Sequence, residues 1–347
     1  MPDGRICVSS LVIAVDWWNI DMGAVKSLLN LFDEEKEAKR LQSSVMVFNL
    51  ATYGGIPESR TIEIYGPEHS GKTYFALNLC WAGLRTFPDA EVLYIDAERT
   101  LSTAFLKPYK NTPEISRFQY VQENSAEAVL ELIEQKYAGH QIEVTVKGKD
   151  GPKKQKKNIP PAKLPIIVID SIASLCTDKQ MEKGMLVQNM EFSFQKLMSL
   201  FYKRNLQRIN GWLILVNQLR ASPNLNAYSK APTEGTPGGR AIKYHASLRL
   251  NITKRKPFSD DSLFAFTLAS DKSKISRAFR CFLDVNKDML LDKWMGCQDL
   301  LKDSGLIKIF TNGRYQYKDG KSLFWSEFVK VLDENEAEIL ETISELQ

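Results

Sequence analysis

The stretch IEIYGPEHSGKT, residues 62–73, decides the fold, because it joins an apolar run to a glycine-rich turn that ends in lysine and threonine. Residues 62–66 predict a strand and residues 74–84 a helix, so the turn directs backbone N–H groups and the positive end of a helix at one point. The GxxxxGK[ST] pattern is typical of a phosphate-binding loop, in which side chains at Gly66 and Gly71 would block the phosphate. The residues predicted to bind a nucleotide here are Gly66, Pro67, Glu68, His69, Ser70, Gly71, Lys72, Thr73 and Tyr74.

Three kinds of side chain would serve such a site. We expect Lys72 to reach the β- and γ-phosphates and the Thr73 hydroxyl to ligate Mg²⁺. Asp170, at the end of IIVID, fits a second metal-holding carboxylate, and an ordinary cap of the next helix is the alternative. Glu98 or Asp96 is expected to orient or deprotonate the attacking water. Strand alternation puts both on the same side, so their spacing does not choose between them.

Near-continuous apolar runs alternate with helical segments through the middle of the chain. Such runs are typical of strands buried on both faces, and they predict an α/β fold with a mainly parallel central sheet flanked by helices. Glu98, Asp170 and Gln218 stand at the carboxyl ends of their runs, where open parallel sheets bind ligands. The runs are IEIYG (62–66), VLYIDAE (92–98), IIVIDS (166–171) and WLILVNQ (212–218).

Composition adds weaker constraints. The chain has 347 residues and a formal net charge of +4, which permits nucleic-acid binding without demanding it. Its five cysteines are odd in number and form no CxxC pair, which favours reduced thiols in a cytosolic protein over a zinc site. The apolar run ICVSSLVIAVDWW (6–18) is too short to span a bilayer and lacks a cleavage site, so we expect a buried strand or interface segment and no membrane role.

Three regions follow. We expect an N-terminal segment over 1–50 that is a candidate for contacts between subunits, a nucleotide-binding core over 51–284, and a small α+β region over 285–347. Asn-Gly and Asp-Gly steps predict a hairpin within 307–320. The apolar spacing of residues 326–347 predicts one acidic terminal helix.

The segment VKGKDGPKKQKKNIPPAK, residues 146–163, has seven lysines, two glycines and three prolines. This composition predicts that it does not pack as an element. It is either a solvated loop between core elements or a non-specific contact with nucleic acid.

The motifs IEIYGPEHSGKT, YIDAE, IIVIDSIASL, LVNQLR and TPGGRAIKYHASLRL follow in the order and spacing of the RecA-type recombinases, which the chain resembles over about 55–280. The compact length and diverged flanks resemble phage-encoded members. The resemblance implies a RecA-type P-loop NTPase core that uses ATP and Mg²⁺. It also implies a DNA-dependent ATPase that forms a helical filament on single-stranded DNA and exchanges strands with double-stranded DNA. The partners would be single-strand-binding and mediator proteins in the cytoplasm, that of a bacterial host if the chain is phage-encoded. A RecA-like mediator or regulatory module that does not exchange strands is the alternative.

The resemblance also implies roles for single residues. It makes Glu98 the water-activating carboxylate and Asp170 the acidic metal ligand. It places Phe105 against adenine, although a buried core phenylalanine is the alternative, and it makes Gln218 a sensor of the γ-phosphate. Lys272 and Lys274 would reach the ATP of the neighbouring subunit, whereas a solvated strand face is the ordinary reading of two such lysines.

Two DNA-binding loops are implied as well. The first lies within 177–189, where Lys179 and Lys183 are its candidate contacts. The second covers 220–240 and would be ordered by ATP through Gln218. Residues 264–270, FAFTLAS, lack the basic side chains that the family carries for a secondary DNA site. The candidates in the second loop are Arg220, Tyr228, Lys230, Glu234, Gly238, Gly239 and Arg240.

Overall fold

The chain divides into two compact units, Met1–Ala38 and Lys39–Gln347. In the computed structural model, residues 38–138, 140–148, 151–159, 163–178, 190–205, 208–222, 233–237, 239–257 and 262–345 are described. The apolar run at 6–18 therefore lies outside the described residues. Within the described ranges, every helix is too short or too polar to cross a membrane.

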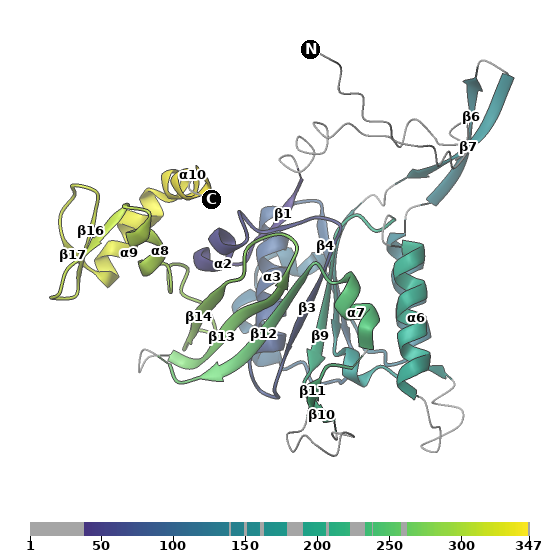
Figure 1. Ribbon diagram of the computed structural model, residues 1–347, viewed down its shortest axis with the longest axis horizontal. Helices are drawn as coiled ribbons and strands as arrows, with labels where there is room; N and C mark the ends of the chain where they lie inside the picture. The colour runs from purple at the N-terminus through teal and green to yellow at the C-terminus, as the bar shows by residue number, and fades with distance from the viewer. Residues whose placement is uncertain are drawn as a thin grey trace, which may run out of the picture. The chain divides into compact units, whose positions relative to one another are not determined.

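One eight-stranded sheet organises the second unit. Figure 1 shows β3, β9 and β4 near its centre and β12, β13 and β14 toward one edge. Strands β12, β3, β9, β8, β4 and β5 run parallel, and β13 and β14 extend the sheet in antiparallel fashion beyond β12. The predicted α/β class with a mainly parallel sheet is confirmed. In spatial order the strands are β14 (Arg280–Asn286), β13 (Ser262–Ser273), β12 (Leu248–Arg255), β3 (Arg60–Gly66), β9 (Trp212–Gln218), β8 (Leu164–Asp170), β4 (Ala90–Asp96) and β5 (Phe118–Val121).

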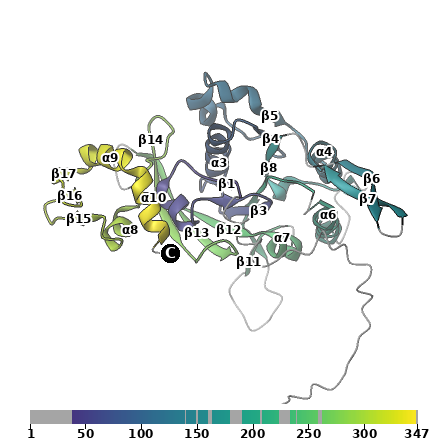
Figure 2. The same cartoon turned by 90° about the horizontal axis from the view of Figure 1, so that it is seen from above.

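Both faces of the sheet are buried, which explains the continuous apolar runs. In β8, Ile166 and Val168 pack into the cluster that holds α3 (Lys72–Thr86), whereas Ile167 and Ile169 pack into a second cluster on the other face. That second face is covered by α4 (Ala126–Tyr137), α6 (Met190–Asn205) and α7 (Gly239–His245). Figure 2 shows α3 on one side of the strands and these three helices on the other.

The elements just before β3 also enter the core. β1 (Arg40–Leu41) pairs with β2 (Ile56–Pro57), and α2 (Met46–Ala51) lies between them in sequence. Leu41 and Phe48 are fully buried in the cluster that contains α3. The predicted boundary between 1–50 and 51–284 stays a prediction, with core packing present on both sides of it.

Residues 140–148 and 151–159 form a hairpin, which corrects the prediction that the lysine-rich segment forms no element. β6 (His140–Gly148) pairs with β7 (Gly151–Ile159) in antiparallel register as a separate two-stranded sheet. β6 carries the alternating β-branched residues that strands favour, and β7 needs only its backbone to pair with it. Prediction from lysine, glycine and proline content missed that pattern because it ignored the preceding residues.

The C-terminal region has α8 (Gln298–Asp303), the strands β15 (Ile307–Ile309), β16 (Arg314–Tyr317) and β17 (Leu323–Phe324), and two helices. The predicted hairpin is confirmed, because β15 pairs with β16 in antiparallel register. The prediction of a single terminal helix is wrong. α9 (Trp325–Glu334) is capped by Asn335, and a second helix, α10 (Glu336–Glu345), follows. The Asn335 side chain donates to the Val331 carbonyl at 2.7 Å, so a polar cap competes with continuation of the helix.

Four cysteines of the described residues, Cys80, Cys176, Cys281 and Cys297, have free thiols, and three of them are buried.

Short elements join the larger ones. The connecting elements are the 3₁₀ helices η3 (Thr103–Tyr109), η4 (Pro113–Arg117) and η5 (Ile172–Ser174), and the strand pair β10 (Arg220–Ser222) and β11 (Thr233–Gly235).

Candidate nucleotide-binding site

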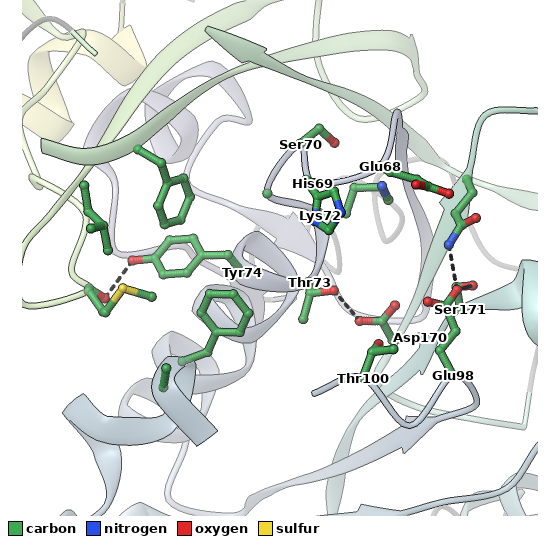
Figure 3. Close-up of a pocket in the computed structure, with 17 residues that line it drawn as sticks. Glu68, His69, Ser70, Lys72, Thr73, Tyr74, Glu98, Thr100, Asp170 and Ser171 are labelled. Atoms are coloured by element: carbon green, nitrogen blue, oxygen red, sulfur yellow. Dashed lines mark hydrogen bonds between the residues drawn. The ribbon is translucent and has the colours of Figure 1, made fainter. Parts of the chain in front are cut away.

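A cavity of about 720 Å³ lies at the carboxyl edge of the parallel strands, around the turn from β3 to α3 (Figure 3). The four strands that the sequence predicted to converge meet here, because β4, β8, β9 and β3 are neighbours in the sheet. The cavity is lined by Glu68, His69, Ser70, Gly71, Lys72, Thr73, Tyr74, Glu98, Thr100, Ala104, Phe105, Asp170, Ser171, Gln218, Leu263, Phe264 and Met289.

The two glycines of the loop are required by the protein itself as well as by a phosphate. A Cβ atom on Gly66 would lie 2.0 Å from the Ile252 carbonyl oxygen of the neighbouring strand β12. Gly71 has a φ of +99°, and its Cβ would lie 3.0 Å from the Phe266 ring. Sheet packing therefore sets the shape of the loop before any ligand binds.

Gly66→Ala tests that packing. We expect it to lower the free energy of unfolding by about 2–4 kcal/mol, because neither backbone can move without breaking the pairing of β3 with β12. Urea denaturation measures the loss. Gly313→Ala is the matched control: Gly313 has a φ of +74° and open space around it, so strain alone should cost about 1–2 kcal/mol. Equal losses for the two variants would contradict the clash.

Lys72 and Thr73 begin α3 and face the acidic groups of the sheet. Lys72 is 8% exposed, and its ammonium donates to the Pro67 carbonyl within the loop. Burial lowers the pKa of Lys72, and the nearby carboxylates of Asp170, Glu98 and Glu68 oppose this shift. Such a partly desolvated cation attracts a polyphosphate more strongly than an exposed lysine does.

The donor set suits Mg²⁺ bound with a nucleotide. The Thr73 hydroxyl donates to Asp170 Oδ2 at 2.7 Å, and Tyr94 donates to the same oxygen at 2.6 Å. Burial raises the pKa of Asp170, against the effect of these two hydrogen bonds. Ser70 Oγ is buried in the loop and has no hydrogen-bond partner among the described residues, as expected where a ligand supplies one. A hydroxyl and a carboxylate are the hard oxygen ligands that Mg²⁺ prefers.

The structure separates the two carboxylates that strand spacing left equivalent. β4 ends at Asp96, so alternation does not continue to Glu98. Asp96 is 1% exposed and accepts hydrogen bonds from the Thr100 and Leu101 N–H groups, which fixes the turn after the strand. Glu98 instead lines the cavity.

Glu98 is held in place by donors from the turn that follows β8 and from the end of β9. Its Oε1 accepts from Ser174 Oγ at 2.9 Å and from Gln218 Nε2 at 2.7 Å, and Ser171 Oγ donates to the same atom. A carboxylate oriented in this way can position a water molecule beside a phosphate. The Gln218 amide contacts this carboxylate, so a group that draws Gln218 to itself would remove one of the three donors to Glu98 Oε1.

An apolar wall closes the other side of the cavity, where Figure 3 shows Tyr74 directed away from the polar groups. The Tyr74 ring packs edge-on against Phe105 and Phe264, with centroids 6.1 and 5.3 Å apart. Phe105 is partly buried and lines the cavity, and its contact with adenine stays a prediction. A flat nucleobase fits such a wall.

Several lining residues carried no signal in the sequence. Leu263 and Phe264 begin the antiparallel strand β13, and Met289 follows β14. Their place at the cavity depends on pairing between distant strands. Ser171, which directly follows Asp170 at a strand end, could have been found from its position. The lining residues missed are Thr100, Ala104, Ser171, Leu263, Phe264 and Met289.

The predicted DNA contacts are only partly within the described residues. Arg220 and Glu234 lie in the strand pair β10–β11, in which Arg220 is opposite Gly235 and Glu234 opposite Ala221. Gly239 begins α7 with a φ of +60°, and Arg240 follows it as an exposed residue. Lys179, Lys183, Tyr228, Lys230 and Gly238 lie outside the described residues.

Lys272 and Lys274 do not line the cavity of their own chain. Lys272 Nζ donates to the Lys243 and Tyr244 carbonyls, and Lys274 Nζ donates to the Tyr244 carbonyl at 3.1 Å. These carbonyls belong to the last turn of α7, where cations are favoured by the helix dipole. A role on a neighbouring subunit stays a prediction.

Comparison with known proteins gives the family. The model of the RecA N-terminal domain matches residues 13–150 and 155–282, which together cover most of the chain. Protein RecA of Arthrospira platensis is 27% identical over 81% of this chain and 71% of its own length. Protein RecA of Nostoc punctiforme is 28% identical over 88% of this chain and 79% of its own length. The mitochondrial DNA repair protein recA homolog 3 of Arabidopsis thaliana is 27% identical over 85% of this chain and 64% of its own length. With its phosphate-binding loop at the carboxyl edge of a mainly parallel sheet, the chain belongs to the RecA family.

Proposed function

We propose that this protein is a DNA-dependent ATPase that assembles on single-stranded DNA and promotes homologous pairing and strand exchange. The observation that carries the proposal is the hydrogen bond from Gln218 to Glu98. Gln218 ends β9 at the cavity, and β10 begins at Arg220, two residues later. A single amide thus joins the nucleotide site to the segment predicted to bind DNA.

In this proposal the loop and Lys72 hold the phosphates of ATP, and the apolar wall of Tyr74, Phe105 and Phe264 holds the base. Thr73 and Asp170 would hold the Mg²⁺ that accompanies ATP, which supplies positive charge to the transferring phosphoryl group. Glu98 orients the attacking water. Lys272 and Lys274 would add positive charge from the next subunit of a filament.

Gln218 would be the group that reports the nucleotide state. With ATP present its amide donates to the terminal phosphate instead of to Glu98. This exchange leaves Glu98 with its two serine donors and an acceptor position open to water, and it moves the start of the 220–240 segment. ATP then favours the state that binds DNA, and hydrolysis favours release. Asn217 ties the far end of that segment to the sheet, because its side-chain amide donates to the Pro237 carbonyl at 2.9 Å.

Lys72→Ala tests the site and the function together. We expect the variant to lose at least roughly tenfold in ATP affinity, because a charge-assisted contact is removed. It should also fail to form ATP-dependent filaments on single-stranded DNA and to exchange strands. Electron microscopy and a strand-exchange assay measure these outcomes. Lys107→Ala, an exposed lysine outside the cavity, is the control. Normal filaments and exchange in Lys72→Ala would overturn the assignment of this cavity.

A RecA-like mediator that binds ATP without exchanging strands is the second candidate. The observation that favours it is that Phe264, in the segment 264–270 without basic residues, lines the cavity instead of offering charge to DNA. ATP hydrolysis measured with and without single-stranded DNA separates the two, because a mediator should show little stimulation. The compact chain and its low identity to cellular relatives also lead us to propose a phage-encoded member acting in the cytoplasm of a bacterial host.

A further inference from the structure

The β6–β7 hairpin carries the net charge of the chain. Residues 140–159 contain six lysines and two acidic residues, a net charge of +4. The whole chain also has a formal net charge of +4, so the other residues sum to zero. A positive charge gathered on one short element, on an otherwise neutral protein, attracts polyanions to that element.

The strand register spreads this charge over the hairpin. Lys153, Lys154, Lys156 and Lys157 all belong to β7, two of them at odd and two at even positions of the strand. Lys156 lies opposite Glu143, the one acidic residue of β6, whereas Lys153 and Lys154 lie opposite Val146 and Thr145. Most of the positive charge therefore has no acidic residue opposite it within the hairpin.

The hairpin is separate from the nucleotide site in its attachment. It follows α4 and precedes the amino end of β8, whereas the cavity lies at the carboxyl ends of the parallel strands. The family model matches residues 140–150 and 155–159 of this segment and skips residues 151–154, at the start of β7. A contact made by the hairpin would therefore not use the residues that line the nucleotide site.

We propose that the β6–β7 hairpin binds the phosphate backbone of double-stranded DNA without regard to sequence. A two-stranded ribbon has the width that the major groove accepts, and its lysines match the dense charge of a duplex. Residues 140–159 contain no Phe, Tyr or Trp, and their one aromatic ring is that of His140, at the first residue of β6, so the hairpin lacks the row of stacking platforms with which proteins hold single strands. This contact does not depend on the proposed ATPase function, because it uses neither the cavity nor ATP.

The test replaces four lysines of β7 by glutamine, Lys153→Gln, Lys154→Gln, Lys156→Gln and Lys157→Gln, in the full chain. Fluorescence anisotropy with a labelled duplex of mixed sequence, without nucleotide, is measured between about 50 and 200 mM salt. The matched control changes four exposed lysines elsewhere, Lys107, Lys110, Lys254 and Lys256, to glutamine. A third variant with arginine at the four β7 positions keeps the charge.

We expect the β7 glutamine variant to bind the duplex at least roughly tenfold more weakly, with a salt slope reduced by about 0.9 for each lost phosphate contact. The control and arginine variants should bind like wild type. Binding of a fluorescent ATP analogue should be unchanged in all three, which shows that they fold and separates this result from failure of the nucleotide site.

Equal losses in the β7 and control variants would overturn the proposal, because they would report net charge alone. A loss confined to a single-stranded oligonucleotide would overturn the choice of duplex. Full duplex affinity, together with lost binding of an acidic protein, would assign the hairpin to a protein partner instead.

Discussion

Glu98→Gln is expected to slow ATP hydrolysis by about 10²–10⁴-fold and to leave ATP binding nearly unchanged. Glutamine keeps a carbonyl oxygen that can accept from Ser174 and Gln218, so the local structure should survive. It has no carboxylate to orient or deprotonate a water molecule. Phosphate release under saturating ATP and single-stranded DNA measures the rate, and a fluorescent ATP analogue measures binding.

Asp96→Asn is the matched control, because it makes the same change two residues away. The Asp96 carboxylate accepts from Thr100 N, Leu101 N and the Tyr120 hydroxyl, the last at 2.8 Å. An asparagine amide would turn a donor toward one of these donors, so we expect a stability loss of about 1–3 kcal/mol. Hydrolysis by the folded protein should fall far less than in Glu98→Gln. If Asp96→Asn instead lost more activity at full stability, the water-orienting role would pass to Asp96.

This pair of carboxylates marks how far the sequence could predict the site. Alternation along a strand treats residues 96 and 98 alike, and only the end of β4 at Asp96 separates them. Asp96 is also bound by Tyr120, whose hydroxyl donates to it from the neighbouring strand β5, a contact between residues far apart along the chain. The resemblance to the RecA family named Glu98, and local spacing did not.

The parts of the fold that could be predicted rest on short-range patterns. The runs at 62–66, 92–98, 166–171 and 212–218 overlap β3, β4, β8 and β9, because burial on both faces demands apolar residues at every position. The phosphate-binding loop was predictable for the same reason, because its pattern lies within eight consecutive residues, 66–73. The place of Phe264 in the apolar wall was not predictable, because this residue joins Tyr74 only through β13, which is reached through antiparallel pairing with β12.

The hairpin at 140–159 shows the opposite failure. Its lysine, glycine and proline content indicated a loop, yet the backbone of β7 pairs along its full length with β6. Composition describes whether a segment can bury a core, and a two-stranded ribbon does not need one to pair. The terminal helices failed for a related reason, since the apolar spacing continues past Asn335 while the side chain of that residue caps α9.

Arg249→Met is expected to lower the free energy of unfolding by about 3–5 kcal/mol, because it leaves a charge buried without its partner. Glu63 is fully buried in the central strand β3, and Arg249 on the adjacent strand β12 is its register partner and donates to it. The Arg249 guanidinium also lies 4.5 Å from the Tyr65 ring centroid. The Glu63 carboxylate also accepts a hydrogen bond from the Asn217 amide, at 2.9 Å.

Adding Glu63→Gln to Arg249→Met should recover most of the loss, since the pair becomes neutral and Asn217 keeps an acceptor. Lys254→Met, at an exposed position of the same strand, is the control and should change stability by less than about 0.5 kcal/mol. Urea denaturation measures all three variants. A double variant as unstable as Arg249→Met would show that lost packing on Tyr65, and not the unpaired charge, causes the effect.

Because the Asn217 side chain donates to both Glu63 and the Pro237 carbonyl, Arg249→Met alone should also loosen the end of the 220–240 segment. We therefore expect it to weaken ATP-dependent binding of single-stranded DNA even under conditions where the protein remains folded.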